Sequence, residues 1–267
     1  MVTKVLTIAG SDSLSGGGLQ TDLATFSAEG VVGFSVISSL ALIGPDKVEI
    51  TAIPTEIFKK QMASIEQVDQ FNAIKVGLLQ SVDQVLLVSQ FLKNYIGPVV
   101  VDPVLAFKEG QLAVDQELID AYLDHLLPLA TITTPNIEEA LALTGSSEVP
   151  KSRTAALVLA KQLSQRARCS LYLKVGNPEK QEEFIDLFFD ENGHRSIFRH
   201  HSVETANNHG AGCTLSAALT AGLAKGESLH DASMAAADYT QMAIANSYSF
   251  SERLAGNVLS NWSVKAK

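Results

Sequence analysis

Residues 4–30 read KVLTIAGSDSLSGGGLQTDLATFSAEG, and this stretch decides the fold class. After Lys4 it opens with an apolar and β-branched run, which predicts a buried strand. A glycine-rich turn follows, and residues 16–30 then place apolar side chains at helical spacing, namely Leu19, Leu23 and Phe26. Gly30 ends the predicted helix. A buried strand joined by a short turn to an amphipathic helix is the repeating unit of α/β proteins.

The same unit recurs along the rest of the chain. Further strands are expected at residues 33–44, 72–79, 98–105, 130–136 and 169–176. Helices are expected between them at residues 55–68 (capped by Thr55), 81–95, 115–127, 136–145 (ending at Gly145) and 151–166. Residues 182–203 predict a hairpin with its turn at residues 190–193, and the chain from Gly212 onward is expected to be mostly helical.

This alternation implies parallel strands with right-handed crossovers and helices on both faces of the sheet. We therefore predict an α/β protein with a three-layer αβα fold around a mostly parallel central sheet. No linker-like stretch interrupts the pattern, so residues 1–267 are expected to form a single domain.

Composition narrows the class of function. The chain has 267 residues and a net charge of −9, which argues against a nucleic-acid partner because phosphate binding needs a basic surface. Two cysteines are too few for a disulfide framework, so a reducing compartment is expected. The N-terminus lacks the features of a signal peptide, and the apolar stretches are shorter than the roughly 20 residues of a membrane span. We expect a cytoplasmic protein with no membrane partner.

Several polar residues and glycines directly follow predicted strands, where the sites of open parallel sheets gather. They are Gly10 to Asp12, Gly77, Asp102, Asn136 and Lys174 to Gly176. Asp102 is either a metal or phosphate-site carboxylate or an aspartate that caps a turn. Asn136 and Glu139 either form a capping box at the start of a helix or face a magnesium–phosphate group. The residues alone leave both alternatives open.

Two glycine-rich stretches are candidate anion sites. The run SGGGLQ, residues 15–20, either offers free N–H groups to an anion or is a flexible turn. The run HGAGCT, residues 209–214, is the stronger candidate, because Gly210, Ala211 and Gly212 let the backbone approach a ligand at the start of a predicted helix. Cys213 then lies at a helix N-terminus, which favours its thiolate. The alternative for Cys213 is a buried small residue beside a tight turn.

Together these stretches resemble one family. LTIAGSDS, GGGLQTDLATFSAEGV, IKVGLL, VVVDPV, TPNIEEALALTG and HGAGCTLSAAL occur in the order and at the spacing of the hydroxymethylpyrimidine kinase and pyridoxal kinase branch of the ribokinase superfamily. The chain is most similar in pattern to the cysteine-containing, thiamine-kinase-like pyridoxal kinases of Gram-positive bacteria. The resemblance runs from about residue 3 to residue 250.

The resemblance implies a ribokinase-like fold and a kinase that uses ATP and Mg²⁺ to phosphorylate a hydroxymethyl group on a small aromatic ring. It implies that Gly10 and Asp22 bind the ring, with Leu78 and Val104 over its faces. Asn136, Glu139 and Lys174 would serve the nucleotide, and Asp102 and Glu139 the metal. Gly210, Ala211, Gly212 and Cys213 would form the catalytic anion hole, with Cys213 at the position where most ribokinase relatives carry an aspartate base. Relatives also suggest a homodimer.

One position bears on the substrate. Hydroxymethylpyrimidine kinases usually carry a glutamine where this chain has Ile43, and an isoleucine cannot hydrogen-bond a pyrimidine edge. We therefore expect a vitamin B6 vitamer (pyridoxal, pyridoxine or pyridoxamine) as substrate. The alternatives are a hydroxymethylpyrimidine/phosphomethylpyrimidine kinase of thiamine biosynthesis and a non-catalytic binding protein of the same fold. Pyridoxal kinases of this branch often carry a second cysteine where this chain has Phe107, so a mechanism that needs a lid thiol is not expected.

Overall fold

The computed structural model describes residues 2–43, 48–105, 115–179, 183–251, 254 and 256–261, and only the backbone of Ile43 and Val48. In this part of the chain a nine-stranded sheet has the order β3-β2-β1-β4-β5-β6-β7-β8-β9. The strands are β1 (Lys4–Asp12), β2 (Val32–Ile43), β3 (Val48–Ala52), β4 (Ala73–Val76), β5 (Val99–Val101), β6 (Ile132–Thr133), β7 (Ser170–Gly176), β8 (Glu183–Phe189) and β9 (Arg195–His201). The strands from β2 to β7 in this order pair in parallel, whereas β3, β8 and β9 join antiparallel at the two ends.

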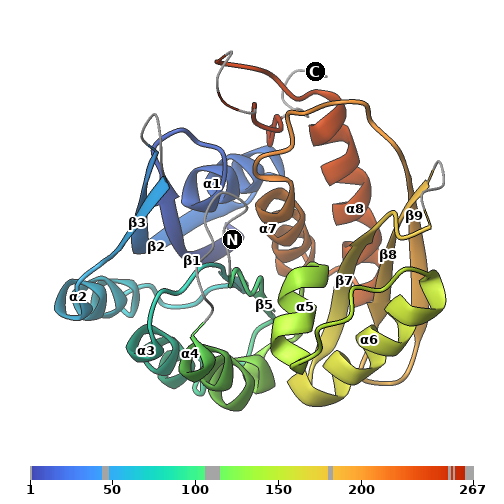
Figure 1. Cartoon of the computed structure of the whole chain (residues 1–267). Helices are drawn as coiled ribbons and strands as arrows, with labels where there is room; N and C mark the ends of the chain where they lie inside the picture. The colour runs from blue at the N-terminus through green and yellow to red at the C-terminus, as the bar shows by residue number, and fades with distance from the viewer. Residues whose placement is uncertain are drawn as a thin grey trace.

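Helices cover both faces of this sheet (Figure 1). One layer holds α2 (Thr55–Ile65), α3 (Val82–Leu92), α4 (Gln116–Ala121), α5 (Ile137–Thr144) and α6 (Arg153–Ala167). The other holds α1 (Gly18–Ala28), α7 (Ala211–Ala224) and α8 (Leu229–Ala245). The α/β class, the mostly parallel sheet and the helices on both faces are therefore confirmed.

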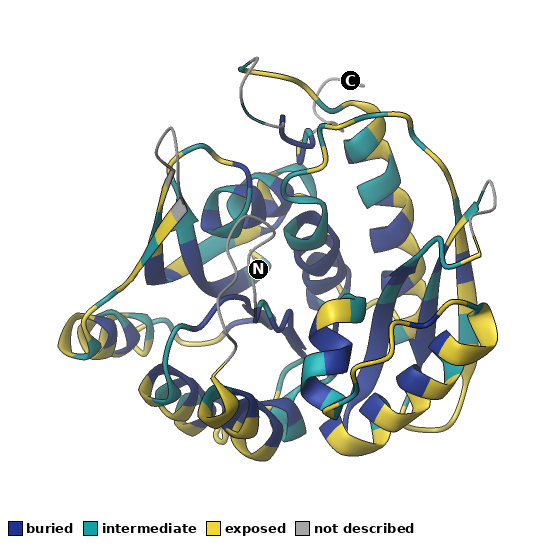
Figure 2. Cartoon of the chain, viewed as in Figure 1, coloured by how far each residue is buried: buried dark blue, intermediate teal, exposed yellow. Residues whose placement is uncertain are grey.

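The central strands are apolar on both sides because each side faces a helix layer. On β1, Leu6 and Ile8 join the cluster under α2 to α6, whereas Val5 joins a cluster with Ala217 and Ala221 of α7. Figure 2 shows the result: burial follows the strands and the sheet-facing sides of the helices, and exposure follows their outer sides. Burial of these side chains is the main favourable term, at about 25 cal/mol per Å² of apolar surface.

The predicted element boundaries hold within a few residues, with three corrections. The strand β3 was missed, although the alternating sequence VEITA after Gly44-Pro45-Asp46 is a strand signal. Thr55 is not a cap, because it is the first residue of α2 and Pro54 precedes it at the N-cap. The helix predicted at residues 115–127 is α4 for only its first turns, and it continues as a π turn (η1, Tyr122–Leu126) and a 3-10 turn (η2, Leu127–Leu129).

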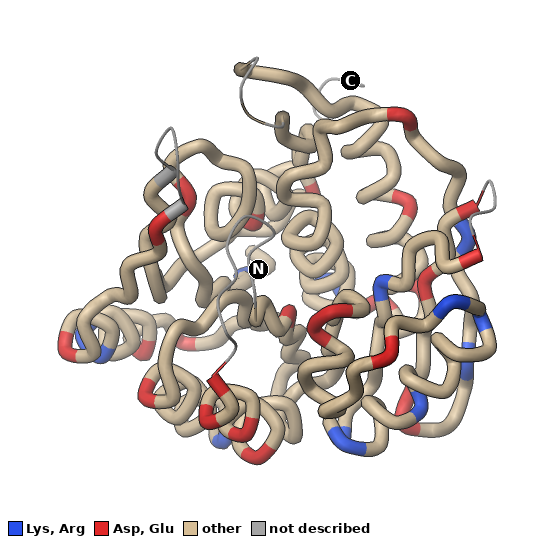
Figure 3. The backbone as a smooth tube through the Cα atoms, in the orientation of Figure 1, with Lys and Arg blue, Asp and Glu red and all other residues tan. Residues whose placement is uncertain are grey.

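Two further features concern the surface. Figure 3 shows acidic positions spread over the layers, whereas Lys and Arg gather mainly around α6, β7 and β9. In the described part of the chain, no helix is both long enough and apolar enough to cross a bilayer.

Candidate active site

The carboxyl ends of the parallel strands bring most of the candidate residues to one edge of the sheet. Gly10 lies near the end of β1, Asp102 directly follows β5, and Lys174 lies near the end of β7. The first turn of α7 meets this edge, because a Cβ atom built on Gly212 would lie 3.3 Å from Lys174 Nζ. Segments more than a hundred residues apart therefore form one site.

Asp102 is the centre of a buried hydrogen-bond network at this edge. Its Oδ1 accepts hydrogen bonds from Lys174 Nζ and Thr134 Oγ1, both at 3.0 Å, and its Oδ2 accepts one from Ser216 Oγ at 3.1 Å. The residue is only 2% exposed. Among the described residues, its carboxylate makes no bond to the turn that follows it. The turn-capping interpretation of Asp102 is therefore wrong.

Lys174 holds a positive charge between two acidic residues. Burial by itself lowers the pKa of Lys174. The nearby carboxylates of Asp102 and Glu139 together raise this pKa by more than burial lowers it, so the net shift is upward. The ammonium group is thus retained at every physiological pH. Part of the side chain remains exposed at the site, where it can meet an anion.

Asn136 and Glu139 form a complete capping box at the start of α5. Asn136 Oδ1 accepts from the Glu139 N–H at 2.9 Å, and Glu139 Oε2 accepts from the Asn136 N–H at 2.8 Å. The structural interpretation of this pair is therefore confirmed. Burial raises the pKa of Glu139 to about 7, although the Lys174 charge opposes this. A cap alone does not require a buried carboxyl beside Lys174, so the second role stays open.

The start of α7 has the backbone geometry of an anion site. Gly210 has a φ of +83°, and a Cβ atom there would lie 2.4 Å from the carbonyl oxygen of Gly16. Only glycine fits this position without strain. The N–H groups of Gly212 and Cys213 lie in the first turn of the helix, where no carbonyl within the helix can accept them. The positive end of the helix dipole adds to their attraction for an anion.

The glycine-rich run at residues 15–20 does not offer free N–H groups to an anion. The Asp12 carboxylate accepts hydrogen bonds from the N–H groups of Leu14, Gly16 and Gly17, at 2.8, 2.9 and 3.1 Å. The next N–H group, that of Gly18, donates to Cys213 Sγ at 3.4 Å. These N–H groups are therefore occupied, and the interpretation of the run SGGG as a free anion cradle is wrong.

Cys213 lies in the first turn of α7, its sulfur accepts a hydrogen bond from the first residue of α1, and part of it remains exposed. Burial raises the pKa of its thiol to about 11, Lys75 lowers it, and Asp22 and Asp102 raise it further. The expectation that the helix N-terminus favours the thiolate is therefore wrong for the ligand-free protein. The resting group is a thiol, because loss of hydration on burial outweighs the attraction of Lys75.

Of the residues expected around a ring, Gly10 and Leu78 lie together at the end of β1, whereas Asp22 is buried below the site. Gly10 lies at a bulge between β1 and β2, and a Cβ atom there would be 2.7 Å from Ser39 Oγ and 3.3 Å from Leu78 Cδ2. Val104 lies two residues after Asp102 and is partly exposed. Asp22, in contrast, has no exposed surface, and its carboxylate pairs with Lys75 and accepts from Thr7 Oγ1 at 2.7 Å.

The side chains of two positions that bear on the substrate lie outside the described part of the structure. Ile43 is the last residue of β2, but its side chain lies outside the described part of the structure. Phe107 also lies outside the described residues.

Several residues of the site carried signals that sequence reasoning passed over. Lys75 is a single lysine inside the apolar strand sequence NAIKVGLL, which is a strong sign of a buried ion pair. Ser216 follows Cys213 by three positions on the same helix face. Thr134 and Asn257 had no such signal. Asn257 donates from Nδ2 to the Leu14 carbonyl at 2.9 Å and pairs with His209, so it ties the two glycine-rich stretches together.

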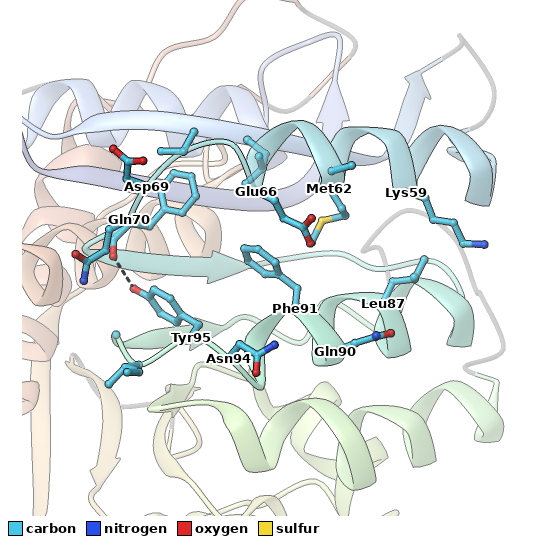
Figure 4. A pocket seen from close by; sticks show the side chains of 16 residues that line it. Lys59, Met62, Glu66, Asp69, Gln70, Leu87, Gln90, Phe91, Asn94 and Tyr95 are labelled. Atoms are coloured by element: carbon cyan, nitrogen blue, oxygen red, sulfur yellow. Dashed lines mark hydrogen bonds between the residues drawn. The ribbon is translucent and has the colours of Figure 1, made fainter.

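One cavity in the described part of the structure lies away from this site. It encloses about 690 Å³ between α2 and α3, beside the amino ends of β4 and β5. Met62, Leu87 and Phe91 lie along it (Figure 4). The Tyr95 hydroxyl donates to the Phe71 carbonyl oxygen at 3.2 Å. The opposite edge of the sheet brings together Asp102, Lys174 and the start of α7, so it is the candidate active site.

Comparisons with known proteins identify the family. Residues 12–258 match the model of the phosphomethylpyrimidine kinase family. The chain is 36% identical over 252 residues to the hydroxymethylpyrimidine/phosphomethylpyrimidine kinase of Rhizobium meliloti strain 1021, covering 92% of this chain and 91% of that one. It is 33% identical over 249 residues to the pyridoxine kinase of Bacillus subtilis strain 168, with 92% and 91% covered.

Among solved structures, an ADP complex of Bacillus subtilis pyridoxal kinase superposes with a TM-score of 0.92 over 100% of both chains, at 31% identity. The relatives are kinases by name, and the solved kinase is an ADP complex. The resemblance inferred from the motifs is thereby confirmed: this chain belongs to the phosphomethylpyrimidine kinase family, and it is a kinase of the pyridoxal or hydroxymethylpyrimidine type.

Proposed function

We propose that this kinase transfers the γ-phosphoryl group of ATP to the hydroxymethyl group of a vitamin B6 vitamer: pyridoxal, pyridoxine or pyridoxamine. The observation that carries the proposal is the convergence of Lys174 with the first turn of α7, where the N–H groups of Gly212 and Cys213 have no carbonyl partner within the helix. An ammonium and two aligned N–H groups at one point suit the charge that spreads over a transferring phosphoryl group.

The chain's own residues perform the transfer by orientation and charge. Phosphoryl transfer needs the hydroxyl and the phosphate in line, with little covalent work from the protein. Gly10, Leu78 and Val104 would hold the ring so that its hydroxymethyl group points at the start of α7. Cys213 Sγ lies at that point and would take the hydroxyl proton as the oxygen attacks. The N–H groups of α7 and Lys174 would hold the phosphate oxygens.

Asp102 and Glu139 would hold the magnesium ion that accompanies the nucleotide. In the described part of the chain, no group of three or more His, Cys, Asp or Glu side chains could hold a metal. Two carboxyl groups nevertheless fit this ion, because Asp102 lies close enough to Glu139 to raise its pKa, and Mg²⁺ usually takes one or two carboxylates and completes its shell with phosphates and water. When bound, the ion neutralises phosphate charge.

The choice of ring rests on Ile43 and on structural likeness. Sequence identity does not separate the two kinase types, at 36% and 33%. The solved pyridoxal kinase, however, superposes over the whole chain. An apolar residue at position 43 leaves a pyrimidine's polar edge without a partner, which costs about 1–3 kcal/mol.

Turnover of ATP with each ring substrate tests this proposal directly. Purified protein with Mg²⁺ and ATP is expected to release ADP fastest with a B6 vitamer and slower with hydroxymethylpyrimidine. Faster turnover with the pyrimidine would replace the proposal with the thiamine-precursor kinase. Binding of a ring with no ADP release in either case would support the non-catalytic alternative.

Substitution of Glu139 by glutamine separates the metal role from the capping role. Glutamine preserves the capping box, since Glu and Gln serve equally at this position. The variant is expected to melt at the wild-type temperature and to lose about 10- to 100-fold in kcat, the usual loss at a metal site. Circular dichroism and steady-state rates over a magnesium series measure both. Wild-type kcat in this variant would leave Glu139 as a cap only.

Substitution of Ile43 by glutamine tests the ring preference. The new amide can hydrogen-bond the pyrimidine edge, so kcat/KM for hydroxymethylpyrimidine relative to pyridoxal should rise by roughly tenfold. An Ile43→Leu variant is the matched control, because it keeps the position apolar. An unchanged ratio in Ile43→Gln would place ring choice elsewhere, for example at residues 14–18.

A further inference from the structure

Beneath the proposed site lies an ion pair that the transfer reaction does not explain. Lys75 and Asp22 pair side chain to side chain, and both have essentially no exposed surface. The Asp22 carboxylate also accepts from Thr7, which stands directly opposite Lys75 in the pairing of β1 with β4. No part of this pair can meet a substrate.

The pair lies one structural layer below Cys213. On α1, the Gly18 N–H donates to Cys213 Sγ, and Asp22 follows four positions later on the same helix face. On the sheet, Ala73 and Lys75 share one face of β4. Ala73 packs in one apolar cluster with Ala217 of α7, and Cys213 lies one turn before Ala217. Toward the carboxyl ends of the strands, Lys75 is the next residue beyond Ala73 on this face of β4, and Cys213 lies one helical turn beyond Ala217 on α7. Lys75 and Cys213 therefore lie in neighbouring layers of the same interface between β4 and α7.

The charges around Cys213 come from each element that packs against it. They are Lys75 on β4, Asp22 on α1, Asp102 after β5, Lys174 on β7 and Asp12 at the end of β1. The Asp12 carboxylate accepts hydrogen bonds from N–H groups of its own loop. After burial, which raises the pKa of Cys213, Lys75 makes the largest contribution and lowers it, whereas Asp22 raises it. The two members of the pair therefore act on the thiol with opposite sign.

A buried ion pair is a poor device for stability. Desolvation of two charges costs about as much as their attraction returns, and apolar residues of similar volume often serve as well or better. An ion pair at this position, directly under the only partly exposed cysteine of the described chain, is therefore explained better by an electrostatic role.

We propose that Lys75 and Asp22 are positioning residues that set how readily Cys213 gives up its proton: Lys75 stabilises the thiolate, and Asp22 holds Lys75 in place while limiting that stabilisation. The proposal rests on the proposed role of Cys213 as proton acceptor. It adds that buried Lys75, which has no contact with the substrate, sets how readily the Cys213 thiol loses its proton.

Thiol reactivity tests this without relying on catalysis. Only the thiolate reacts with iodoacetamide, so the alkylation rate of Cys213 at a fixed pH of about 9 follows its thiolate fraction. Labelling is located by mass spectrometry, which separates Cys213 from buried Cys169. Lys75→Met is expected to slow alkylation by at least about tenfold, since a nearby opposite charge shifts a pKa by about one to three units. Asp22→Asn is expected to accelerate it, because Lys75 still faces Asp102 and keeps its charge.

The opposite signs distinguish electrostatics from structure. Both variants break the same ion pair, so a purely structural role predicts that both change the rate in the same direction. Such a result, or unchanged rates in both, would overturn the proposal. Circular dichroism and melting curves confirm that each variant is folded. Should Lys75→Met not fold, the double variant Asp22→Leu with Lys75→Met removes both charges, and it is expected to alkylate more slowly than wild type.

This result is independent of the proposed function. If Cys213→Ala retains full kinase activity, the thiol is not the proton acceptor, yet the alkylation rates still report whether Lys75 governs it. If Cys213 is essential and the alkylation rates do not move, the proposed function stands and the tuning by Lys75 fails.

Discussion

Replacement of Cys213 by alanine is expected to lower kcat for pyridoxine phosphorylation by about 10²- to 10⁴-fold, the usual worth of a positioned acid–base group. Alanine keeps the unpaired N–H groups of α7, because they belong to the backbone. The KM for ATP should therefore change little. Steady-state ADP release measures both constants. Cys169→Ala is the matched control, since Cys169 is the other cysteine of the chain and is buried away from the site.

The comparison of two substrates defines what the thiol does. A proton acceptor is needed for pyridoxal and pyridoxine alike, so equal losses support that role. A loss confined to pyridoxal would instead indicate a contact between sulfur and the aldehyde, which pyridoxine lacks. Wild-type kcat on both substrates would remove Cys213 from the mechanism.

The pH dependence provides an independent check on Cys213. Burial raises the pKa of the thiol to about 11, so its thiolate fraction grows about tenfold per pH unit below that value. Where chemistry limits the rate, wild-type kcat should rise from pH 7 to pH 9. Cys213→Ala should show a flat profile over the same range. A flat wild-type profile would contradict a thiolate acceptor.

Replacement of Lys174 by methionine is expected to lower kcat/KM for ATP by about 10²- to 10³-fold, because it removes a preorganised charge from the phosphate position. Methionine has a similar length, so packing against Gly212 is largely kept. Steady-state kinetics at varied ATP give the value. Lys161→Met, on the exposed side of α6, is the matched control for loss of a lysine.

A double variant separates two effects of Lys174→Met: the loss of charge at the phosphate and the loss of folding stability. Lys174→Met leaves Asp102 buried without its cation, which by itself destabilises the fold. The double variant with Asp102→Asn removes this unpaired charge and should recover the melting temperature. Activity should stay low, because the double variant lacks both the charge at the phosphate and a proposed magnesium ligand. Recovery of activity together with stability would show that Lys174 only neutralises Asp102 and that Asp102 holds no metal.

Much of the fold followed from short-range pattern. The strand at residues 4–10 and the helix after it were predictable because alternation of buried strands and amphipathic helices leaves few packings other than a covered parallel sheet. Helix ends were predictable where the capping group lies within a few positions. Gly30 and Gly145 take positive φ angles at helix ends, as expected for glycine.

Two errors in the predicted helices and strands arose where the local sequence pattern does not decide the structure. The strand β3 pairs antiparallel with β2 at the edge of the sheet, outside the repeated alternation of strand and helix on which the prediction rested. The helix from residue 115 changes to π and 3-10 turns near Pro128, which cannot donate a backbone hydrogen bond.

The location of the site was predictable, but its electrostatics were not. Motifs at strand ends identified Asp102, Lys174 and the start of α7, because the carboxyl ends of parallel strands meet at one edge. Local sequence also indicated that Asn136 and Glu139 cap a helix, since the two groups are three residues apart. It could not determine that Asp102 pairs with Lys174, 72 residues away, or that Asp22 pairs with Lys75, 53 residues away. Nor could it reveal that the Cys213 thiol stays protonated. A pKa depends on desolvation and on charges nearby in space, and both arise only when distant segments pack together.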